Sequence, residues 1–595
     1  MKIVSKHPLV FAVSLMATVA AGWGCKNFLE DASEPLGTLD QNTLLNKAGV
    51  EGSLLSAYRI LDCTSQFSPD WGCAASNWVW GSVTSDDAYK GSEATDQPPI
   101  DDIEQFHWAT GKSEGYLNTK WSGVYEGVNR ANATLRLLKQ VQETKPGEIT
   151  DDEAKGIQGE AIFLRAHYHF EAWRMWGNVP YYREDDSTFK KANLQADAVP
   201  TEILKDLDEA IGLLGTGPRN GQKGRADQWT AKAYKGRVQV YTGKYTEALA
   251  TLGEVRTAGP YALETSFDKV WTGYSDEANG KETIFAYQAS ANDGETNGNN
   301  ANFGERLNFP HSGSPFGCCG FHQPSQNLVN YFRVDAAGLP LALSDGSWNS
   351  NSANFTAANN TVAVDPRLDW TVGRDGVPYK DWGKHAASWI RAPAYGGTYS
   401  PKKNAHEKTS GAESSVGWVP TQLNSVNIHI FRYADLLLLL AEAEVEAGSP
   451  ANAITIVNEI RTRAGQKAQG PGIDAAGAAN RALIAVPIND PSITWATYRV
   501  GLYPGGLNQT QAREAVRAER RLELAMEGQR FFDLRRWGIA ETTLNAYIAV
   551  EKTRRTQLGS AETFSARHRY FPIPAIQIEL SKSNGQNTLV QNPGW

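Results

Sequence analysis

The segment LLLLLAEAEVEAGSPANAITIVNEIRTRAG, residues 436–465, predicts how the helical part of this chain packs. Its small residue Ala441 is followed by Gly448 seven positions later and by Ala453 twelve positions later. This spacing predicts a helix, a tight turn at the glycine and a second helix, with small residues where the two helices cross closely. The fold is therefore expected to contain paired antiparallel helices.

A second segment, AKAYKGRVQVYTGKYTEALATLGEVRTAGP at residues 231–260, repeats this spacing. Its small residue Gly236 is followed by Gly243 at seven positions and by Ala248 at twelve. Both segments have tetratricopeptide-like spacing, and such units bury their apolar faces only by stacking on neighbours. We therefore expect further helices to stack beside them, at residues 116–142, 151–176, 200–214 and 510–537.

The composition indicates a globular chain that does not bind nucleic acid. The 595 residues are 41% hydrophobic and 21% charged, which is ordinary for a folded protein. The formal net charge is −8, and no stretch rich in Lys and Arg stands out. A basic surface for nucleic acid is therefore not expected.

The N-terminus has the pattern of a secretory signal. Lys2 and Lys6 precede an apolar segment at residues 9–21, which is shorter than the roughly 20 residues that cross a bilayer. We predict a signal peptide over residues 1–24 and a lipid anchor at Cys25, which stands where a bacterial lipobox would end. Gly22 departs from the aliphatic residue that is usual in a lipobox, so a soluble export beginning at Cys25 is the alternative.

Four further cysteines are expected to form disulfides, because an exported chain meets an oxidising environment. They are Cys63, Cys73, Cys318 and Cys319, and they allow three pairings. Cys63 and Cys73 would close a short loop, whereas GCCG is either a disulfide between neighbours or two half-cystines that reach elsewhere. No metal site and no cofactor are expected, because neither pair is a CxxC and no HxxxH lies beside them.

The middle of the chain differs from its helical flanks. Residues 281–422 are rich in Gly, Asn, Ser and Pro, lack a long helical period and contain five tryptophans. We predict an irregular insert with short strands, whose loops are a favourable place for binding residues. The domain organisation expected is an N-terminal helical region at residues 25–280, this insert, and a C-terminal helical region at residues 423–595.

Several strings, in collinear order from about residue 28 to residue 595, resemble the RagB/SusD family of Bacteroidetes lipoproteins. They are SDDAYKG (85–91), DIEQFHW (102–108), FHQPSQNLVNYF (321–332), FRYADLLLLLAEAEVEAG (431–448), VRAERRLELAMEGQRFFDLRRWG (516–538) and RYFPIPAIQIEL (569–580). The arginine-rich string at 516–538 is the most specific of them.

The resemblance implies a mostly α, SusD-like fold of stacked tetratricopeptide-like helix pairs with a large aromatic-rich insert. It also implies a surface-exposed lipoprotein of the outer membrane, without catalytic activity, that captures oligo- or polysaccharide. The implied partner is a SusC-like TonB-dependent transporter. Because the RagB branch is associated with peptides, capture of a peptide or glycopeptide is the first alternative, and a scaffold that binds no ligand is another.

Acidic residues in the arginine-rich string raise the question of catalysis. Glu519, Glu523 and Glu527 lie at four-residue intervals among arginines, and paired carboxylates can flank a glycosidic bond. Carboxylates next to several guanidiniums are more often ion pairs that join helices and stay ionised. We therefore expect no enzyme activity, with a surface glycosidase as the least favoured function.

Sugar capture needs flat apolar faces and planar polar groups. In the family the ligand face lies near the SDD string and on loops of the insert, which correspond here to residues 86–101 and 292–399. The predicted stacking residues are Trp71, Tyr89, Trp348, Trp382, Trp389 and Tyr395. The predicted polar partners are Asp87, Asp96, Asn299, Arg374 and Arg391. For each tryptophan the alternative is a place in the core, where most tryptophans lie.

Overall fold

A computed structural model describes residues 41–62, 70–109, 111, 113–311, 313–356, 362–417, 422–469, 472–473, 479–480 and 493–595. The predicted signal peptide, Cys25 and Cys63 lie outside these ranges. Within them, no helix combines the length and the apolar character that a membrane crossing requires.

Helices make up most of the regular structure on both sides of the insert. The helices before it are α2 (Gln41–Leu44), α3 (Lys47–Arg59), α4 (Pro98–Glu104), α5 (Glu114–Thr144), α6 (Asp151–Trp176), α7 (Val199–Leu213), α8 (Gln228–Tyr241) and α9 (Tyr245–Ala258). Those within it are α10 (Gln326–Tyr331), α11 (Leu341–Ser344), α12 (Arg367–Thr371) and α13 (Pro393–Gly396). Those after it are α14 (Tyr433–Ala447), α15 (Pro450–Ala464), α16 (Gln509–Leu524), α17 (Arg530–Arg536), α18 (Ala540–Glu551) and α19 (Ala575–Leu580).

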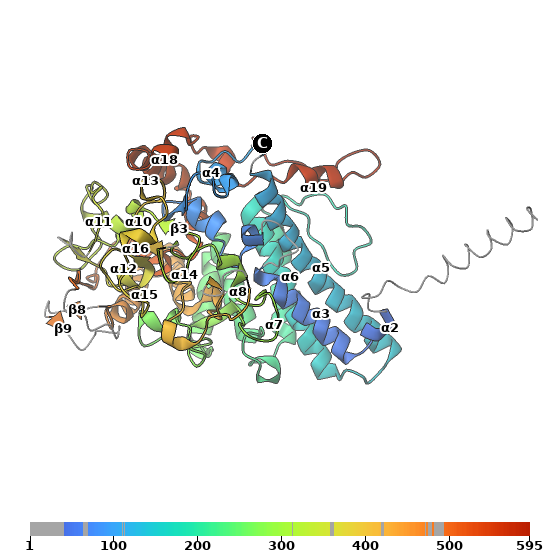
Figure 1. The fold of residues 1–595 in the computed structure, drawn as a ribbon. Coiled ribbons are helices and arrows are strands. Elements are labelled where there is room, and N and C mark those ends of the chain that lie inside the picture. Colours follow the sequence, from blue (N-terminus) through green and yellow to red (C-terminus); the bar gives the residue numbers. More distant parts are fainter. Residues whose placement is uncertain are drawn as a thin grey trace, which may run out of the picture.

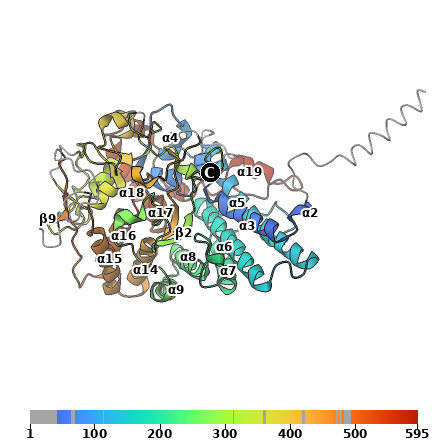
Figure 2. The same ribbon diagram turned by 60° about the horizontal axis from the view of Figure 1, so that its bottom comes forward.

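The long helices form one continuous stack. Helix α3 packs on α5, α5 on α6, α6 on α7, α7 on α8 and α8 on α9; α9 then packs on α14, which contacts α15 and α16. The diagonal run of α3, α5 and α6 is visible in Figure 1, and Figure 2 shows α5 to α9 following one another along the underside. The predicted mostly α fold of stacked helix pairs is confirmed.

The two helix pairs read from the sequence are present as α8 with α9 and α14 with α15. Gly243 forms the first turn with a φ of +72°, a conformation that favours glycine. A β-carbon on Gly236 would collide with the side chain of Leu252 on α9. The small residues of the repeat therefore lie where the two helices cross closely, as predicted.

Helix α6 begins and ends at the predicted residues because its sequence carries both signals. The Thr150 hydroxyl accepts from the backbone N–H of Glu153, and the Glu153 carboxylate accepts from the Thr150 N–H at 3.2 Å, which forms a capping box. Gly177, with a φ of +68°, ends the helix.

The helix predicted over residues 510–537 is two helices, so that prediction is wrong in one respect. Between α16 and α17 the chain passes through Met526 and Gly528, with φ values of +65° and +67°. A β-carbon on Gly528 would collide with the carbonyl oxygen of Ser76. The helix is interrupted because the two backbones touch at this point.

Short strands tie the insert to the helical frame. Strand β2 (Thr283–Tyr287) pairs antiparallel with β7 (Ile428–Arg432) near the two ends of the insert, and β1 (Ala88–Gly91) pairs antiparallel with β3 (Phe321–Pro324). The remaining strands are β4 (Ala363–Val364), β5 (Val372–Gly373), β6 (Ser400–Pro401), β8 (Gly472–Ile473), β9 (Ala479–Asn480) and β10 (Thr497–Tyr498). The short strands expected in the insert are present, while the domain boundaries at residues 280 and 422 stay a prediction.

The acidic residues of the arginine-rich string form the predicted ion network. Glu519 and Glu523 both accept from Arg367, at 2.7 and 2.9 Å, and Arg432 joins Glu523 to Glu527 at 2.7 and 2.8 Å. The side chains of Glu519, Glu523 and Arg367 are 0% exposed. These carboxylates hold α16 against the insert and β7.

Candidate ligand-binding surface

The loop of residues 92–97, called the 92–97 loop below, lies between β1 and α4 and is shaped by one buried lysine. The Lys90 ammonium donates to the carbonyls of Glu93 and Asp96, at 2.9 and 2.8 Å, and to the Asp101 carboxylate at 3.1 Å. Because its side chain is 0% exposed, the ammonium closes the loop from within. The loop lies beside α4, which stands with α13 and α18 along the top of Figure 1.

Arg391 of the insert fastens the outer side of this loop. Its guanidinium donates to the Ser92 hydroxyl at 3.1 Å and to Asp96 Oδ2 at 2.7 Å, and it also pairs with Glu93. The Ser92 hydroxyl donates in turn to Asp96 at 2.9 Å. Asp96 and Arg391, each predicted as a polar ligand partner, thus lie together at the surface in one cluster of donors and acceptors.

Tyr395 covers the same loop from α13. Its hydroxyl donates to Asp101, and the Lys90 ammonium lies 4.9 Å from the centroid of its ring. Burial and the nearby carboxylates of Glu104 and Asp101 raise the pKa of the Tyr395 hydroxyl. The Tyr395 side chain is half-buried.

Glu104 lies beneath Tyr395 and Lys90 as an acid that keeps its proton. Burial, and then the charge of Asp101, raise the pKa of Glu104 to about 8. Its Oε1 accepts from the Lys90 backbone N–H at 3.2 Å. The Glu104 carboxyl group is therefore mostly protonated at pH 7.

Trp71 joins the other side of the 92–97 loop. Its indole N–H donates to the Tyr116 hydroxyl at 2.5 Å, and that hydroxyl donates to Gln97 Oε1 at 2.7 Å. The Arg306 guanidinium lies 4.9 Å from the Trp71 ring centroid, so one side of the half-buried ring is covered. Trp71, Asp96, Arg391 and Tyr395 are thus four predicted residues that the fold gathers around one loop.

A disulfide turn supports the loop from behind. Cys318 and Cys319 are bonded to each other, which is one of the two arrangements predicted for GCCG. The next residue, Gly320, accepts a hydrogen bond from the Ser92 N–H at 2.5 Å and donates one to the Phe309 carbonyl at 2.8 Å. Cys73 is also disulfide-bonded, and Cys63, its expected partner, lies outside the described residues.

Four predicted ligand contacts are internal, and the structure corrects their assignment. Tyr89 is 1% exposed and donates to Glu551, and Trp389 is 7% exposed within an aromatic cluster. Asp87 pairs with Arg521 at 3.0 Å, and Arg374 pairs with Asp369 at 2.6 Å. Because these four side chains are buried against protein groups, we do not propose them as ligand contacts.

Three other predicted residues lie away from the 92–97 loop. The half-buried Trp348 packs edge-on against Tyr331, with ring centroids 5.2 Å apart. Trp382, also half-buried, donates to the His406 carbonyl at 2.8 Å. Asn299 accepts through its carbonyl from Arg59, beside a separate cleft of about 430 Å³.

The sequence interpretation missed several members of the surface. Lys90, Glu93 and Gln97 fall inside the predicted segment 86–101, whereas Arg306 and Gln557 come from distant parts of the chain. Gln557 follows α18 and donates to the Tyr395 carbonyl at 2.8 Å. The polar, turn-forming run after SDDAYKG was the one local signal for these residues.

A stack of helix pairs that carries an irregular, aromatic and polar loop surface defines a helical-repeat binding protein. The SusD family model matches residues 281–595, and a second model, described as starch-binding associating with outer membrane, matches residues 75–240. The chain belongs to the SusD family.

Relatives agree with this assignment over most of the chain. SusD-like protein P38 of Formosa agariphila is 25% identical over 477 residues, covering 77% of this chain and 78% of its own. A laminarin-binding SusD-like protein has the same fold, with a TM-score of 0.62 and 24% identity, over 92% of this chain and all of that chain. Surface glycan-binding protein A from Bacteroides thetaiotaomicron, solved with laminarihexaose, superposes with a TM-score of 0.61 at 19% identity, over 92% of this chain and 99% of that chain.

Proposed function

We propose that this protein is a surface lipoprotein that captures oligo- or polysaccharide at the 92–97 loop and delivers it to a SusC-like TonB-dependent transporter. The observation that carries the proposal is the cluster of Trp71, Tyr395, Asp96 and Arg391 around one loop of a SusD-family frame. A sugar ring offers C–H groups that stack on aromatic faces and paired hydroxyls that match planar polar groups.

The relatives support a glycan as the ligand. Their names describe laminarin binding and a laminarihexaose complex. Laminarin is therefore the first glycan to test. A peptide is the alternative to test beside it, since aromatic faces also hold peptide side chains.

The acids of the arginine-rich string support binding without hydrolysis. A glycosidase needs one carboxylic acid that reaches the glycosidic oxygen and one carboxylate beside it. Glu519 and Glu523 are 0% exposed and bound to guanidiniums, so they cannot reach a glycan in this conformation. We therefore propose that the protein is not an enzyme.

The membrane anchor remains a proposal that concerns residues outside the described part. We propose that Cys25 carries the lipid and holds the protein on the outer membrane. Labelling with a radioactive fatty acid in the native host should mark the wild type and leave Cys25→Ala unmarked. An unlabelled wild type would favour a soluble export instead.

Affinity electrophoresis and calorimetry with laminarin and a panel of other polysaccharides test the binding. At least one glycan should bind, and Trp71→Ala should weaken that binding about tenfold. Tyr274→Ala is the matched control, because Tyr274 is an aromatic residue 37% exposed on another part of the surface. If no glycan binds and peptides do, or if both variants lose affinity equally, the proposed site is wrong.

Delivery is tested with the transporter present. Cells that carry the transporter and Trp71→Ala should take up the bound glycan more slowly at limiting concentration. Normal uptake at limiting glycan with Trp71→Ala would instead support the alternative of a scaffold that binds no ligand.

A further inference from the structure

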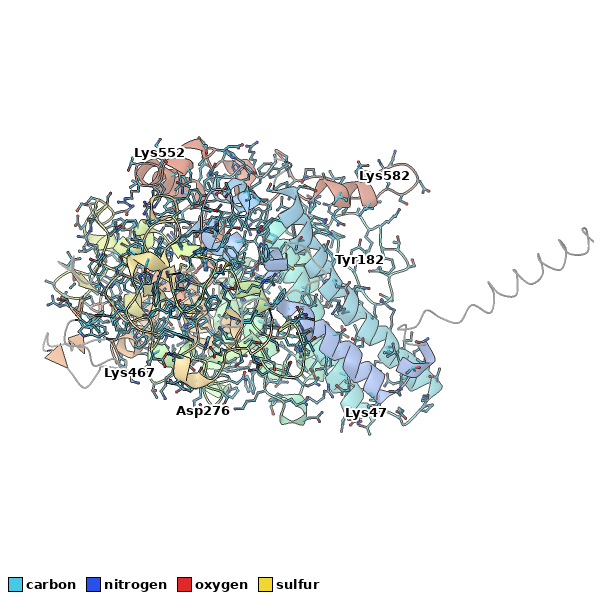
Figure 3. All side chains as sticks on the ribbon, in the orientation of Figure 1. Lys47, Tyr182, Asp276, Lys467, Lys552 and Lys582 are labelled. Atoms are coloured by element: carbon cyan, nitrogen blue, oxygen red, sulfur yellow. A yellow bond between two sulfur atoms is a disulfide. The ribbon has the colours of Figure 1, made fainter. Side chains whose placement is uncertain are left out.

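A second concave surface, called the α5 groove below, lies along helix α5. It has a volume of about 230 Å³ and lies between α5, the segment 180–191 and the C-terminal residues 577–589. Figure 3 labels Tyr182 in the space between α5 and the C-terminal turn at Lys582. Within the described part of the chain, the lining of the groove includes none of the four residues proposed as ligand contacts, which are Trp71, Asp96, Arg391 and Tyr395.

One side of α5 forms the floor of the groove. The side chains that line it here recur at intervals of four and seven residues, which places them on one side of a helix. They are Trp121, Tyr125, Asn129 and Arg136. Tyr116, whose hydroxyl donates into the 92–97 loop, lies nine residues before Tyr125, which is about two and a half turns. The groove and the 92–97 loop therefore lie on opposite sides of α5.

Hydrogen bonds fix both walls of the groove to α5. The Asn132 amide donates to the Tyr182 carbonyl at 3.2 Å and so holds the segment 180–191. On the other wall, Gln577 Nε2 donates to Asn118 Oδ1 at 2.8 Å. The folded protein thus forms the groove by itself, which lowers the cost of ordering the site when a ligand binds.

The walls expose an aromatic ring and an aliphatic side chain to solvent. Phe189 is 75% exposed and Leu580 is 63% exposed. The half-buried Tyr182 donates from its hydroxyl to the Phe189 carbonyl at 2.7 Å, and its ring packs edge-on against Tyr125, with centroids 5.9 Å apart. Large exposed apolar side chains beside one cavity mark a binding surface, and an exposed ring offers a flat face to the C–H groups of a sugar.

Planar polar groups with unused hydrogen-bonding capacity lie on the floor of the groove. The Asn129 side chain is exposed, and its amide forms no hydrogen bond within the described part of the chain. The exposed Arg136 guanidinium donates there to a single acceptor, the Glu184 carbonyl, at 3.3 Å. The two residues are seven positions apart, which is about 10 Å along the helix. An amide and a guanidinium at this spacing can each hold hydroxyl groups of a saccharide.

The other charges in the groove are matched by protein groups. Lys191 pairs with Asp186 at 2.8 Å, and Arg183 pairs with Asp206 at 2.8 Å. Arg136 is the remaining basic residue among the described residues that line the groove. Because little charge is left to attract an acidic ligand, the groove favours a neutral one.

We propose that the α5 groove is a second glycan site, in which a neutral saccharide stacks on Phe189 and Tyr182 while Asn129 and Arg136 bind its hydroxyl groups. The proposal rests on the proposed function in one respect, which is that the ligand of the protein is a glycan. Because the two surfaces lie on opposite sides of α5, each binds its own stretch of sugar.

Hydroxyl-radical footprinting of the full chain, read by mass spectrometry, locates the bound glycan. The probes are laminarihexaose, laminarin and the other polysaccharides of the panel. With at least one of them, oxidation of Phe189 and Leu580 should fall to less than about a third, because a covered side chain loses its contact with solvent. Leu502 and Tyr274, 52% and 37% exposed elsewhere, should keep their relative oxidation and correct for radicals that the sugar consumes.

The footprint separates the two proposals. Protection of Trp71 and Tyr395 without protection of Phe189 would overturn the second site and leave the proposed function standing. Protection of Phe189 alone would support the second site and remove the 92–97 loop as a ligand surface. Protection of neither surface by any probe would overturn both.

Two substitutions test stacking and hydrogen bonding in the groove. Both are made in a Trp71→Ala background, so that calorimetry reports the binding that remains after the loop surface is weakened. Phe189→Ala and Asn129→Ala should each weaken that binding about tenfold, through loss of a stacking face and of a hydrogen bond. Leu502→Ala is the matched control and should leave it unchanged. Thermal unfolding checks that each variant is folded. No remaining binding in Trp71→Ala, or equal affinity in all variants, would overturn the proposal.

Discussion

Arg521 donates from Nε to Asp87 Oδ1 at 3.0 Å, although 434 residues separate the two in the chain. The neighbouring Asp86 receives Arg530 in the same way, at 2.8 Å. The SDD string and the arginine-rich string, which carried the family resemblance, are therefore two sides of one buried ion cluster.

Removing one partner from this buried ion cluster should lower the free energy of unfolding. Arg521→Ala leaves the buried Asp87 carboxylate without its counter-charge, and such a loss destabilises a protein by about 3–5 kcal/mol. Arg513→Ala is the control, because its pair with Glu446 is partly exposed, with side-chain exposures of 28% and 22%. That loss should be under about 1 kcal/mol. Urea unfolding measures both, and equal losses would contradict the structural role assigned to Arg521.

Arg391 should contribute to glycan affinity and contribute little to folding stability. It lies at the surface and fastens the 92–97 loop through Ser92 and Asp96. Arg391→Ala should weaken binding of the best glycan about tenfold in calorimetry and change the midpoint of thermal unfolding by no more than a few degrees. An unchanged affinity would remove Arg391 from the proposed ligand surface.

The buried acid beneath that surface should make stability depend on pH. Burial and the Asp101 charge raise the pKa of Glu104 to about 8, above the value of about 4.3 in an unfolded chain. The folded state therefore binds this proton more tightly, and stability falls as pH rises from about 4.3 to about 8. Urea unfolding measures the difference in the free energy of unfolding between Glu104→Gln and the wild type. That difference should be more favourable to the variant at pH 8 than at pH 5. The exposed Glu541→Gln is the control, and a parallel pH response of all three proteins would refute the assignment.

The buried Glu171 should make the protein less stable as the pH falls, which is the opposite dependence to that of Glu104. Burial alone would raise the pKa of Glu171, but the charges of Arg174 and Lys120 hold it at about 2. Its contribution is complete above about pH 4.3 and is lost as pH falls toward 2. Between pH 5 and pH 2.5 the wild type should therefore lose more stability than Glu171→Gln. A steeper loss in the variant, seen by circular dichroism during acid titration, would reverse this sign.

The helical frame could be predicted because its signals are local. The bounds of α6 follow from capping signals at its two ends, and the turn at Gly243 follows from the spacing of small residues along two successive helices. That Glu523 forms ion pairs was predicted, but its partners Arg367, Arg432 and Arg463 come from distant segments that the sequence did not identify. The break at Gly528 could not be predicted, because it depends on contact with Ser76, far away in the sequence.

The candidate surface was predictable as a region and only partly as residues. The segment 86–101 was the right place, yet both Tyr89 and Lys90 of β1 are buried, since the strand is covered on both faces. Alternation therefore gave no sign of which side chain meets solvent. In the same way nothing in the sequence separates the half-buried Trp382 from the buried Trp389, because burial in an irregular insert depends on long-range packing.

Helix α5 spans the distance between the proposed ligand surface and the first helices of the described chain. Tyr116 near its start binds Gln97 of the 92–97 loop, and the Lys47 N–H at the start of α3 donates to Glu148, four residues after the end of α5, at 3.3 Å. The residues from Tyr116 to Thr144 correspond to about 42 Å of straight helix. The 92–97 loop and the start of α3 are therefore fixed at opposite ends of one rod, so the distance between them does not depend on the conformation of any loop.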